Sequence, residues 1–321
     1  MAEQFFSERN LQGLAGHVFM PRPRVKEWER RLLRRDSVAL LLGVQASAGQ
    51  EYSMFKSHVY IRPKNFTGEL SRFVNLLWAL VLREFKGRYR RSLLGPAWAI
   101  LQPVLYMVIF TFLRGALEIP SDGVPYVIFT YSALVPWTFF SNAVMRCGPS
   151  VASNAPVLKK VAISREVFPL AGVVTSFIDF IIASIILAGM IVWFRLGLGM
   201  ALFWLPFLVG LTAFLAFGVG LAVAAIGTYK LDIIFAVPFL MQFWLLATPI
   251  MYPLSKVPDR WRFLYSLNPM VGIIEGFRTV IVKGVTPDLS LLLVSAVGAV
   301  LFWILAWSFF RYTSQYFADV L

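Results

Sequence analysis

The chain has 321 residues, of which 58% are hydrophobic and only 15% are charged, and its mean hydropathy is +0.70. A soluble domain of this length has too few interior positions for so much apolar surface, so the composition predicts a protein that is embedded in a lipid bilayer. The net charge is +13, and the first 94 residues hold 17 Lys and Arg against 8 Asp and Glu, a bias typical of a cytoplasmic membrane flank rather than of a nucleic-acid binder.

Residues 1–53 differ from the rest of the chain. An arginine-rich patch, a short apolar run and the tripeptide Ala46-Ser47-Ala48 together mimic a secretory signal peptide with its cleavage site. We reject that interpretation because the patch lies too far into the chain, and because secretion would place the later arginines on the wrong side of the membrane. From Met54 onward the sequence has the pattern of a self-contained membrane protein. We therefore interpret residues 1–53 as an extension that is disordered or dispensable, or as the result of a start site assigned too early.

Residues 54–92 form the expected cytoplasmic segment, and residues 70–89 within it have the periodicity of an amphipathic helix. Its apolar stripe consists of Phe73, Leu76, Leu77, Leu80 and Val81. Such a helix lies in the membrane interface with its basic face among anionic head groups. A surface helix of a soluble N-terminal domain is the alternative. The cations that crowd the end of this segment are Arg83, Lys86, Arg88, Arg90 and Arg91.

The charged run stops at Arg91, and no charged residue follows until Arg114. We predict six spans, at residues 93–113, 124–145, 167–194, 196–229, 233–252 and 289–310, with the usable part of the fourth at about 201–227. The expected fold is an all-α integral membrane protein whose six-span domain covers residues 93–321. An even number of spans places both termini in the cytoplasm, although the basic connection at 253–288 departs from the positive-inside pattern.

That connection contains a helical segment at residues 267–282, which is too short to cross a bilayer. Asn268 and Pro269 break it near its start, and Glu275 and Arg278 are three residues apart, so one helix face can pair them. The sequence therefore predicts a re-entrant or interfacial helical segment between the fifth and sixth spans.

Motifs for catalysis are absent from the sequence. It has no Gly-x-x-x-x-Gly-Lys phosphate loop, no His-Glu-x-x-His, no Gly-x-Ser-x-Gly and no histidine in a predicted span. Cys147 is the only cysteine, and His17 and His58 are the only histidines, so neither an intrachain disulfide nor a Cys/His metal site is expected. The sequence favours a conduit or scaffold over an enzyme, with no metal and no cofactor of its own.

Asp179 is the only carboxylate deep inside a predicted span. A charge at such a position is costly and can mark a substrate or ion contact. Because no Lys or Arg falls within the predicted spans to match it, we expect a protonated or hydrogen-bonded contact between helices.

Two predicted spans combine aromatic and polar residues on one face. The residues concerned are Trp98, Gln102, Tyr106 and Ile109 in the first span, and Phe235, Phe239, Gln242 and Phe243 in the fifth. Rings with polar atoms between them suit a path for sugars, which stack on aromatic faces and hydrogen-bond at their edges. Lipid-facing or core packing is the alternative.

Four sequence motifs, taken in chain order, resemble those of one family of membrane proteins. RYRRSLLGPAWAILQP at 88–103 and LKKVAISREVFPL at 158–170 resemble the signature before the first span and the coupling segment of type 2 ABC-transporter permeases that export cell-surface polysaccharides of the O-antigen and teichoic-acid group. YKLDI at 229–233 resembles the family's Tyr-Arg-Asp-Ile turn, with Lys and an additional Leu before Asp, and YSLNPMVGIIEGFR at 265–278 resembles its Asn-Pro segment. The resemblance covers about residue 60 to the C-terminus.

The resemblance implies a homodimer in the cytoplasmic (inner) membrane, joined by two copies of a separate subunit that binds ATP. The substrate would be a polysaccharide on a polyprenyl-diphosphate lipid. Motion would enter through the helix at 73–89 and through residues 157–165, and the coupling residues would be Lys159, Lys160, Arg165 and Glu166. The first and fifth spans of both copies would enclose the path, lined by Trp98, Tyr106, Phe235, Phe239 and Phe243.

The five cations before the first span would hold the diphosphate of the lipid, since guanidinium groups match phosphate oxygens. Alternatively, these cations bind lipid head groups and set the orientation of the chain in the membrane. The two roles are compatible. For the whole chain two other functions stay open: an ABC exporter of a drug or small lipid, and an integral-membrane transferase acting on lipid-linked sugar. The transferase predicts a cluster of carboxylates or a histidine, which the sequence does not show.

Overall fold

A computed structural model describes residues 66–90, 92–119, 123–158, 164–197 and 199–320. The predicted extension at 1–53, Arg91, Lys159 and Lys160 lie outside the described residues, so the predictions made for them stay predictions. The chain divides into one unit that ends at residue 68 and a compact unit at 69–321. Every regular element in the described ranges is a helix, as the sequence predicts.

Five of the described helices are long and apolar enough to cross a membrane. They coincide with the first, second, third, fourth and sixth predicted spans. These helices are α5 (Trp98–Leu117, after the 3₁₀ turn Gly95–Ala97), α6 (Tyr126–Ser150), α8 (Val167–Trp193), α9 (Leu205–Tyr229, after the 3₁₀ turn Met200–Trp204) and α13 (Leu289–Ser314).

The fifth predicted span is shorter than expected. Helix α10 (Asp232–Leu246) has 15 residues, which is about 22 Å against a hydrocarbon core of about 30 Å. Residues 247–250 form turns instead of a further helical turn. The reason is local: Pro249 has no N–H to donate and disfavours helix at the residue before it.

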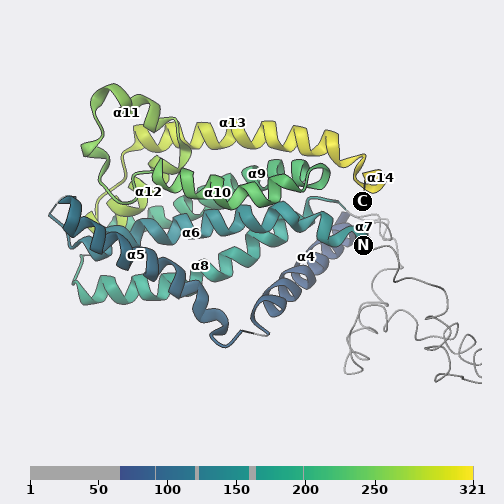
Figure 1. The fold of residues 1–321 in the computed structure, drawn as a ribbon, viewed down its shortest axis with the longest axis horizontal. Helices are drawn as coiled ribbons and strands as arrows, with labels where there is room; N and C mark the ends of the chain where they lie inside the picture. Colours follow the sequence, from purple (N-terminus) through teal and green to yellow (C-terminus); the bar gives the residue numbers. More distant parts are fainter. Residues whose placement is uncertain (1–65, 91, 120–122, 159–163, 198, 321) are drawn as a thin grey trace, which may run out of the picture. The chain divides into compact units, whose positions relative to one another are not determined.

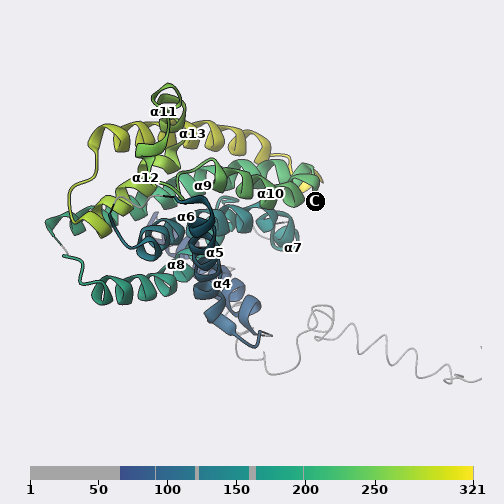
Figure 2. The same cartoon turned by 60° about the vertical axis from the view of Figure 1, so that its left-hand side comes forward.

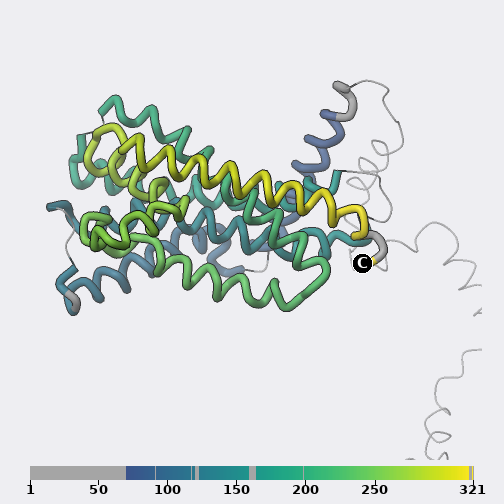
Figure 3. Tube along the Cα trace, turned by 90° about the horizontal axis from the view of Figure 1, so that it is seen from above, coloured from purple at the N-terminus to yellow at the C-terminus, as the bar shows by residue number. Residues whose placement is uncertain are grey.

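Helix α6 is the centre of the compact unit. Its neighbours are α8 and α9, with α5, α10 and α12 (Pro269–Arg278) also in contact, and Figures 1 and 2 show α6 between α8 and α9. Helix α13 packs on α9 and runs along the bundle (Figure 3). Small residues allow close approach: a Cβ on Gly220 of α9 would lie 2.5 Å from the Sγ of Cys147 in α6.

Short helices occupy the two ends of the bundle (Figure 1). Helices α7 (Ala155–Leu158, after the 3₁₀ turn Ala152–Asn154) and α14 (Phe317–Val320) lie at one end, and α11 (Asp259–Ser266, after the 3₁₀ turn Leu254–Lys256) and α12 lie at the other. A π-helical turn, Thr279–Lys283, follows α12.

The predicted helical segment between the last two spans is confirmed. Helix α12 begins at Pro269, and the side chain of Asn268 caps it by accepting a hydrogen bond from the backbone N–H of Met270 at 3.1 Å. With 10 residues the helix is only about 15 Å long, so it cannot span.

Helix α4 (Phe66–Tyr89) confirms the predicted amphipathic helix, but its apolar stripe contacts protein. Leu80 and Val81 are buried in a core that includes Val167 and Phe168 of α8. A second apolar row is exposed instead, at positions spaced by four. Its members are Leu70, Val74, Trp78 and Leu82. Helix α4 therefore has one apolar face for the bundle and another that remains uncovered in the single chain.

Candidate functional site

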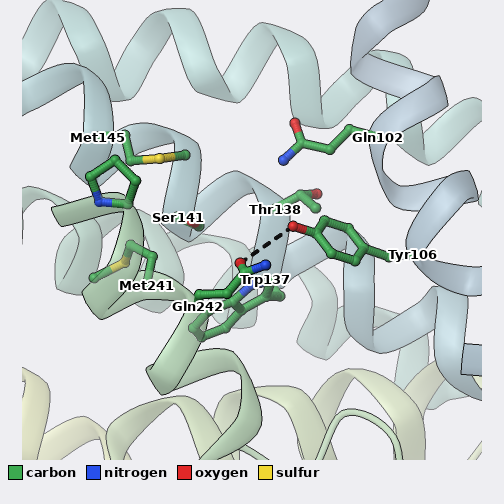
Figure 4. A pocket seen from close by; sticks show the side chains of 9 residues that line it. Gln102, Tyr106, Trp137, Thr138, Ser141, Met145, Met241 and Gln242 are labelled. Carbon is green, nitrogen blue, oxygen red and sulfur yellow. Dashed lines mark hydrogen bonds between the residues drawn. The ribbon is translucent and has the colours of Figure 1, made fainter. Parts of the chain in front are cut away.

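A cavity of about 220 Å³ with a mixed polar and apolar lining lies between α5, α6 and α10 (Figure 4). The first span contributes Gln102 and Tyr106, one turn apart on one face, and α10 contributes Gln242. The rest of the lining comes from Trp137, Thr138, Ser141 and Met145 of α6 and from Pro238 and Met241 of α10. The three helices thus bring amide and hydroxyl groups into a space within the helical bundle.

Two hydrogen bonds hold the walls of this cavity together. The Tyr106 hydroxyl donates to Oε1 of Gln242 at 3.4 Å, drawn as the dashed line in Figure 4. The Asn142 amide of α6 donates to Oε1 of Gln102 at 3.3 Å. The first and fifth predicted spans therefore meet through the polar residues that the sequence placed between aromatic ones.

The predicted aromatic path divides into two parts in the single chain. Tyr106 lines the cavity, whereas Phe235, Phe239 and Phe243 lie on a neighbouring face of α10 and are each at least 70% exposed. Trp98 is also exposed, at the start of α5. Within one copy of the chain, α10 turns Gln242 and not these phenylalanines toward α5. The path expected between the first and fifth spans of two copies stays a prediction.

The predicted cations at the end of α4 have different surroundings. Arg83 donates to Oδ1 of Asn154 in the 3₁₀ turn that follows α6, and Arg88 donates to Oδ2 of Asp179 at 2.9 Å. Lys86 and Arg90 are exposed. Arg83 and Arg88 thus connect α4 to the bundle through hydrogen bonds, whereas Lys86 and Arg90 are exposed to the surroundings.

Asp179 of α8 is the centre of a group that we call the Asp179 cluster, together with Arg88, Tyr89 and Arg146. Nη1 of Arg88 and Nη2 of Arg146 both donate to Oδ2 of the carboxylate, and the Tyr89 hydroxyl donates to Oδ1 at 2.8 Å. The expected contact between helices is present. The expectation that no cation matches Asp179 is wrong, because two arginines do.

The sequence missed Arg146 for a specific reason. The hydropathy pattern ends the second span at residue 145, whereas α6 continues to Ser150. Arg146 therefore lies inside the helix rather than in the following loop. Gly172 lets α8 approach it, since a Cβ at that position would lie 3.1 Å from the Cβ of Arg146. One signal in the sequence was available: Arg146 directly follows the second predicted span, and the third predicted span contains the single carboxylate Asp179. Pairing these two charges would have predicted the contact.

Helix α4 makes one further polar contact with α8. Thr175, one turn before Asp179, donates to Oε2 of Glu84 at 3.5 Å. Burial raises the pKa of the Glu84 carboxyl above its ordinary value, although Arg83 and Thr175 oppose the shift. Burial, with the hydrogen bond and charge of Asp179, raises the pKa of the Tyr89 hydroxyl far above its ordinary value, so Tyr89 stays a neutral donor.

A second buried group, the Arg278 cluster, lies at the end of the bundle formed by α11 and α12. The guanidinium of Arg278 donates to the carbonyl oxygens of Ile250, Tyr252 and Phe129 and lies 3.8 Å from the ring centroid of Phe129. The predicted pair with Glu275 is confirmed, at 3.5 Å. Asn268 joins α12 to α10, because it accepts from the indole N–H of Trp244 at 3.0 Å and donates to Thr248 at 3.1 Å.

The described part of the predicted coupling segment contains Arg165 and Glu166. Glu166 immediately precedes α8 and is buried, and it accepts from Nη1 of Arg311 in α13 at 3.2 Å. Arg165 is half-buried. The carboxylate predicted for coupling therefore joins α8 to α13.

Comparisons with known proteins cover the region that holds the cavity and both clusters. A model of the ABC-2 type transporter family matches residues 75–282. The chain is 31% identical over 265 residues to the O-antigen export system permease protein RfbA of Myxococcus xanthus, which covers 78% of this chain and 97% of the relative. It is 26% identical over 217 residues to the polysialic acid transport protein KpsM of Escherichia coli, covering 64% and 81%. It is 27% identical over 221 residues to the capsule polysaccharide export inner-membrane protein CtrC of Neisseria meningitidis serogroup B, covering 63% and 77%.

Proposed function

This chain belongs to the ABC-2 type transporter family, and we propose that it is the permease subunit of an ATP-driven exporter of a polysaccharide carried on a polyprenyl-diphosphate lipid. The observation that carries the proposal is the 31% identity to an O-antigen export permease across 97% of that relative's length. The cavity between α5, α6 and α10 supports it, because hydroxyl and amide groups suit the edges of sugars.

The working assembly is a homodimer with two copies of a separate ATP-binding subunit. Support comes from the surfaces that the single chain leaves uncovered. The exposed face of α10 carries Phe235, Phe239 and Phe243, and that of α5 carries Ile109 and Phe112. In a dimer these faces lie toward the second copy, where their rings join those of Trp98 and Tyr106 along the path.

The chain uses no cofactor of its own in this proposal, since ATP is bound by the partner subunit. The basic N-terminal region supports a cytoplasmic location for α4 and for both termini. Lys159, Lys160 and Arg165 contact the ATPase in this scheme. Because Glu166 is held by Arg311, we assign it to bracing the coupling segment rather than to the subunit interface.

The proposal is tested by identifying what the complex carries. The chain is purified with its ATPase from the native host in lipid nanodiscs, and the retained lipid is analysed by mass spectrometry. A lipid-linked glycan is the expected result. Loss of drug resistance with unchanged surface polysaccharide in a deletion strain would instead support the exporter of a drug or small lipid.

The basic end of α4 provides a first test by mutation. Replacing Arg88, Arg90 and Arg91 together by Gln should reduce surface polysaccharide several-fold and leave the complex with the ATPase intact, because phosphate contacts are lost. Replacing Lys256, Arg260 and Arg262 by Gln is the matched control, since it removes the same charge from exposed positions at the other end of the bundle. Unchanged export in the first variant would refute the phosphate role.

The aromatic residues provide a second test. Changing Trp98, Tyr106, Phe235 and Phe239 to Ala should slow translocation more than four equivalent changes on α13. Suitable control positions are the exposed residues Leu293, Phe302, Leu305 and Phe309. Export is measured as surface polysaccharide per unit of complex in the membrane. Equal effects would show that the rings only pack.

A further inference from the structure

The Asp179 cluster has the construction of an anion site. Two guanidinium groups, from α4 and α6, converge on a single oxygen of the Asp179 carboxylate, and the Tyr89 hydroxyl binds the other oxygen. Guanidinium and hydroxyl donors arranged in this way also match the oxygens of a phosphate group. The chain therefore holds a site for an oxyanion and fills it with its own carboxylate.

The members of the cluster differ in their access to the surroundings. The Asp179 side chain is 6% exposed, that of Arg146 is 16% exposed and that of Arg88 is 38% exposed. An arriving anion therefore meets Arg88 first. Lys86 of α4 and Arg90, which directly follows α4, are each two residues from Arg88 and exposed, so they add positive charge to this end of the helix.

The release of Arg88 does not isolate a buried charge. When Arg88 leaves, Asp179 keeps its bonds to Arg146 and Tyr89, and the large penalty of an unpaired carboxylate in an apolar interior does not arise. Removing Arg146 would carry a larger penalty than releasing Arg88, because Arg146 is the more buried of the two cations that balance the carboxylate. The geometry thus makes one ion pair of the cluster exchangeable.

We propose that Asp179 is a placeholder for the diphosphate of the substrate: it holds Arg88 while the site is empty, and a phosphate oxygen takes Arg88 when the lipid arrives. The inference rests on the proposed function and adds Asp179, Tyr89 and Arg146 to it as positioning residues. A diphosphate carries more negative charge than one carboxylate, so it competes successfully for an accessible guanidinium. Asp179 thereby sets the affinity of the entrance for the lipid.

The experiment measures binding of farnesyl diphosphate to the complex with its ATPase in phosphatidylcholine nanodiscs. Asp179→Asn should tighten binding about fivefold, the size of one partly exposed ion pair. The gain should vanish in the double variant Asp179→Asn/Arg88→Gln, because the two residues act on each other. Asp288→Asn is the matched control, since it removes one exposed carboxylate at the start of α13 and should not change the affinity.

A second variant keeps the test decisive if Asp179→Asn does not fold. Tyr89→Phe removes one of the other partners of Asp179, so the carboxylate depends more on Arg88 and holds it more strongly. Binding of farnesyl diphosphate should weaken about twofold to threefold, and only while Arg88 is present. Unchanged or weaker binding by a folded Asp179→Asn, or no effect of Tyr89→Phe, would overturn the placeholder.

The arms of the experiment separate the possible sources of phosphate. Farnesyl diphosphate should bind more tightly than inorganic pyrophosphate, and the effect of Asp179→Asn should persist when phosphatidylglycerol is added to the nanodiscs. If phosphatidylglycerol abolishes the effect, head groups occupy the site and the inference fails. If Arg88→Gln weakens diphosphate binding but Asp179→Asn has no effect, the placeholder fails while the proposed function stands.

Discussion

The Arg278 cluster and the Asp179 cluster both bury charge among the helices, but with opposite consequences. Arg278 is 1% exposed, and three of its partners are backbone carbonyls on α6 and on the turns after α10. Among the described residues, the partners of Asp179 are all side chains, and the side chain of Arg88 is 38% exposed. Carbonyl partners cannot move without disrupting the backbone, whereas a partly exposed side chain can exchange its partner. The Arg278 cluster therefore fixes the local backbone, whereas the Asp179 cluster contains a side chain that can exchange its partner.

The largest effect is expected from breaking the Arg278 cluster. Arg278→Met leaves the carbonyls of Ile250, Tyr252 and Phe129 without this donor in an apolar region and removes the partner of Glu275. The variant should lose about 3 kcal/mol or more of folding free energy. The measurement is the apparent Tm and the monodisperse yield of the complex in detergent.

Arg262→Gln on α11 is the control for that change. Its pair with Asp259 is exposed, with a separation of 3.5 Å, so the expected loss is about 0.5 kcal/mol or less. Similar stabilities for Arg278→Met and Arg262→Gln would contradict the fixed role of the Arg278 cluster.

An intermediate effect is expected from widening the contact that forms the Asp179 cluster. Gly172→Val places a side chain where a Cβ alone would lie 3.1 Å from Arg146, so α8 must move away from α6. The expected cost is about 1–3 kcal/mol of folding free energy, measured as a lower apparent Tm of the complex in detergent. Gly189→Val on the same helix is the control, since nothing lies within 4 Å of its Cβ position.

The smallest effect concerns pH and the docking of α4 beside the Asp179 cluster. The pKa of Glu84 is raised by burial, so the folded state binds the proton more tightly than the unfolded state does. The folding free energy that this shift contributes is fully present below the ordinary pKa of a glutamate, and it is lost as the pH rises through the raised pKa of Glu84. We expect a loss of about 0.5 kcal/mol or less, given the partial exposure of the group.

Glu84→Gln should remove this dependence. The apparent Tm of the wild-type complex should fall slightly between about pH 4 and about pH 7, and that of the variant should stay flatter over the same interval. A variant with the same slope as the wild type would show that Glu84 does not titrate with the docking of α4.

The helices of this protein were predictable because their signals are local. Uncharged apolar runs located five spans, and Asn268 and Pro269 marked the start of α12. The exception, α10, also has a local cause that the hydropathy pattern does not include, namely the proline at 249. The amphipathic helix α4 was found from its periodicity, but periodicity does not tell whether protein or lipid covers an apolar face.

The candidate site was predictable only in part. Tyr106, Gln102 and Gln242 were singled out by their position among aromatic residues, and they do line one cavity. The α6 residues that complete the lining, such as Thr138 and Ser141, gave no signal in the sequence, because small hydroxyl side chains are common in packed helices. Arg146 was missed because a shift of five residues in the end of α6 changes a loop residue into a helix residue.

The sequence by itself determined the class of the protein, the approximate positions of its long helices, and the motifs that resemble its family. The tertiary structure decided which charges pair. Arg88 is 91 residues from Asp179 and Arg278 is 149 residues from Phe129, and no local pattern relates residues so far apart. Charges buried in an apolar bundle take the partners that helix packing brings within hydrogen-bonding distance, so their roles follow from the fold.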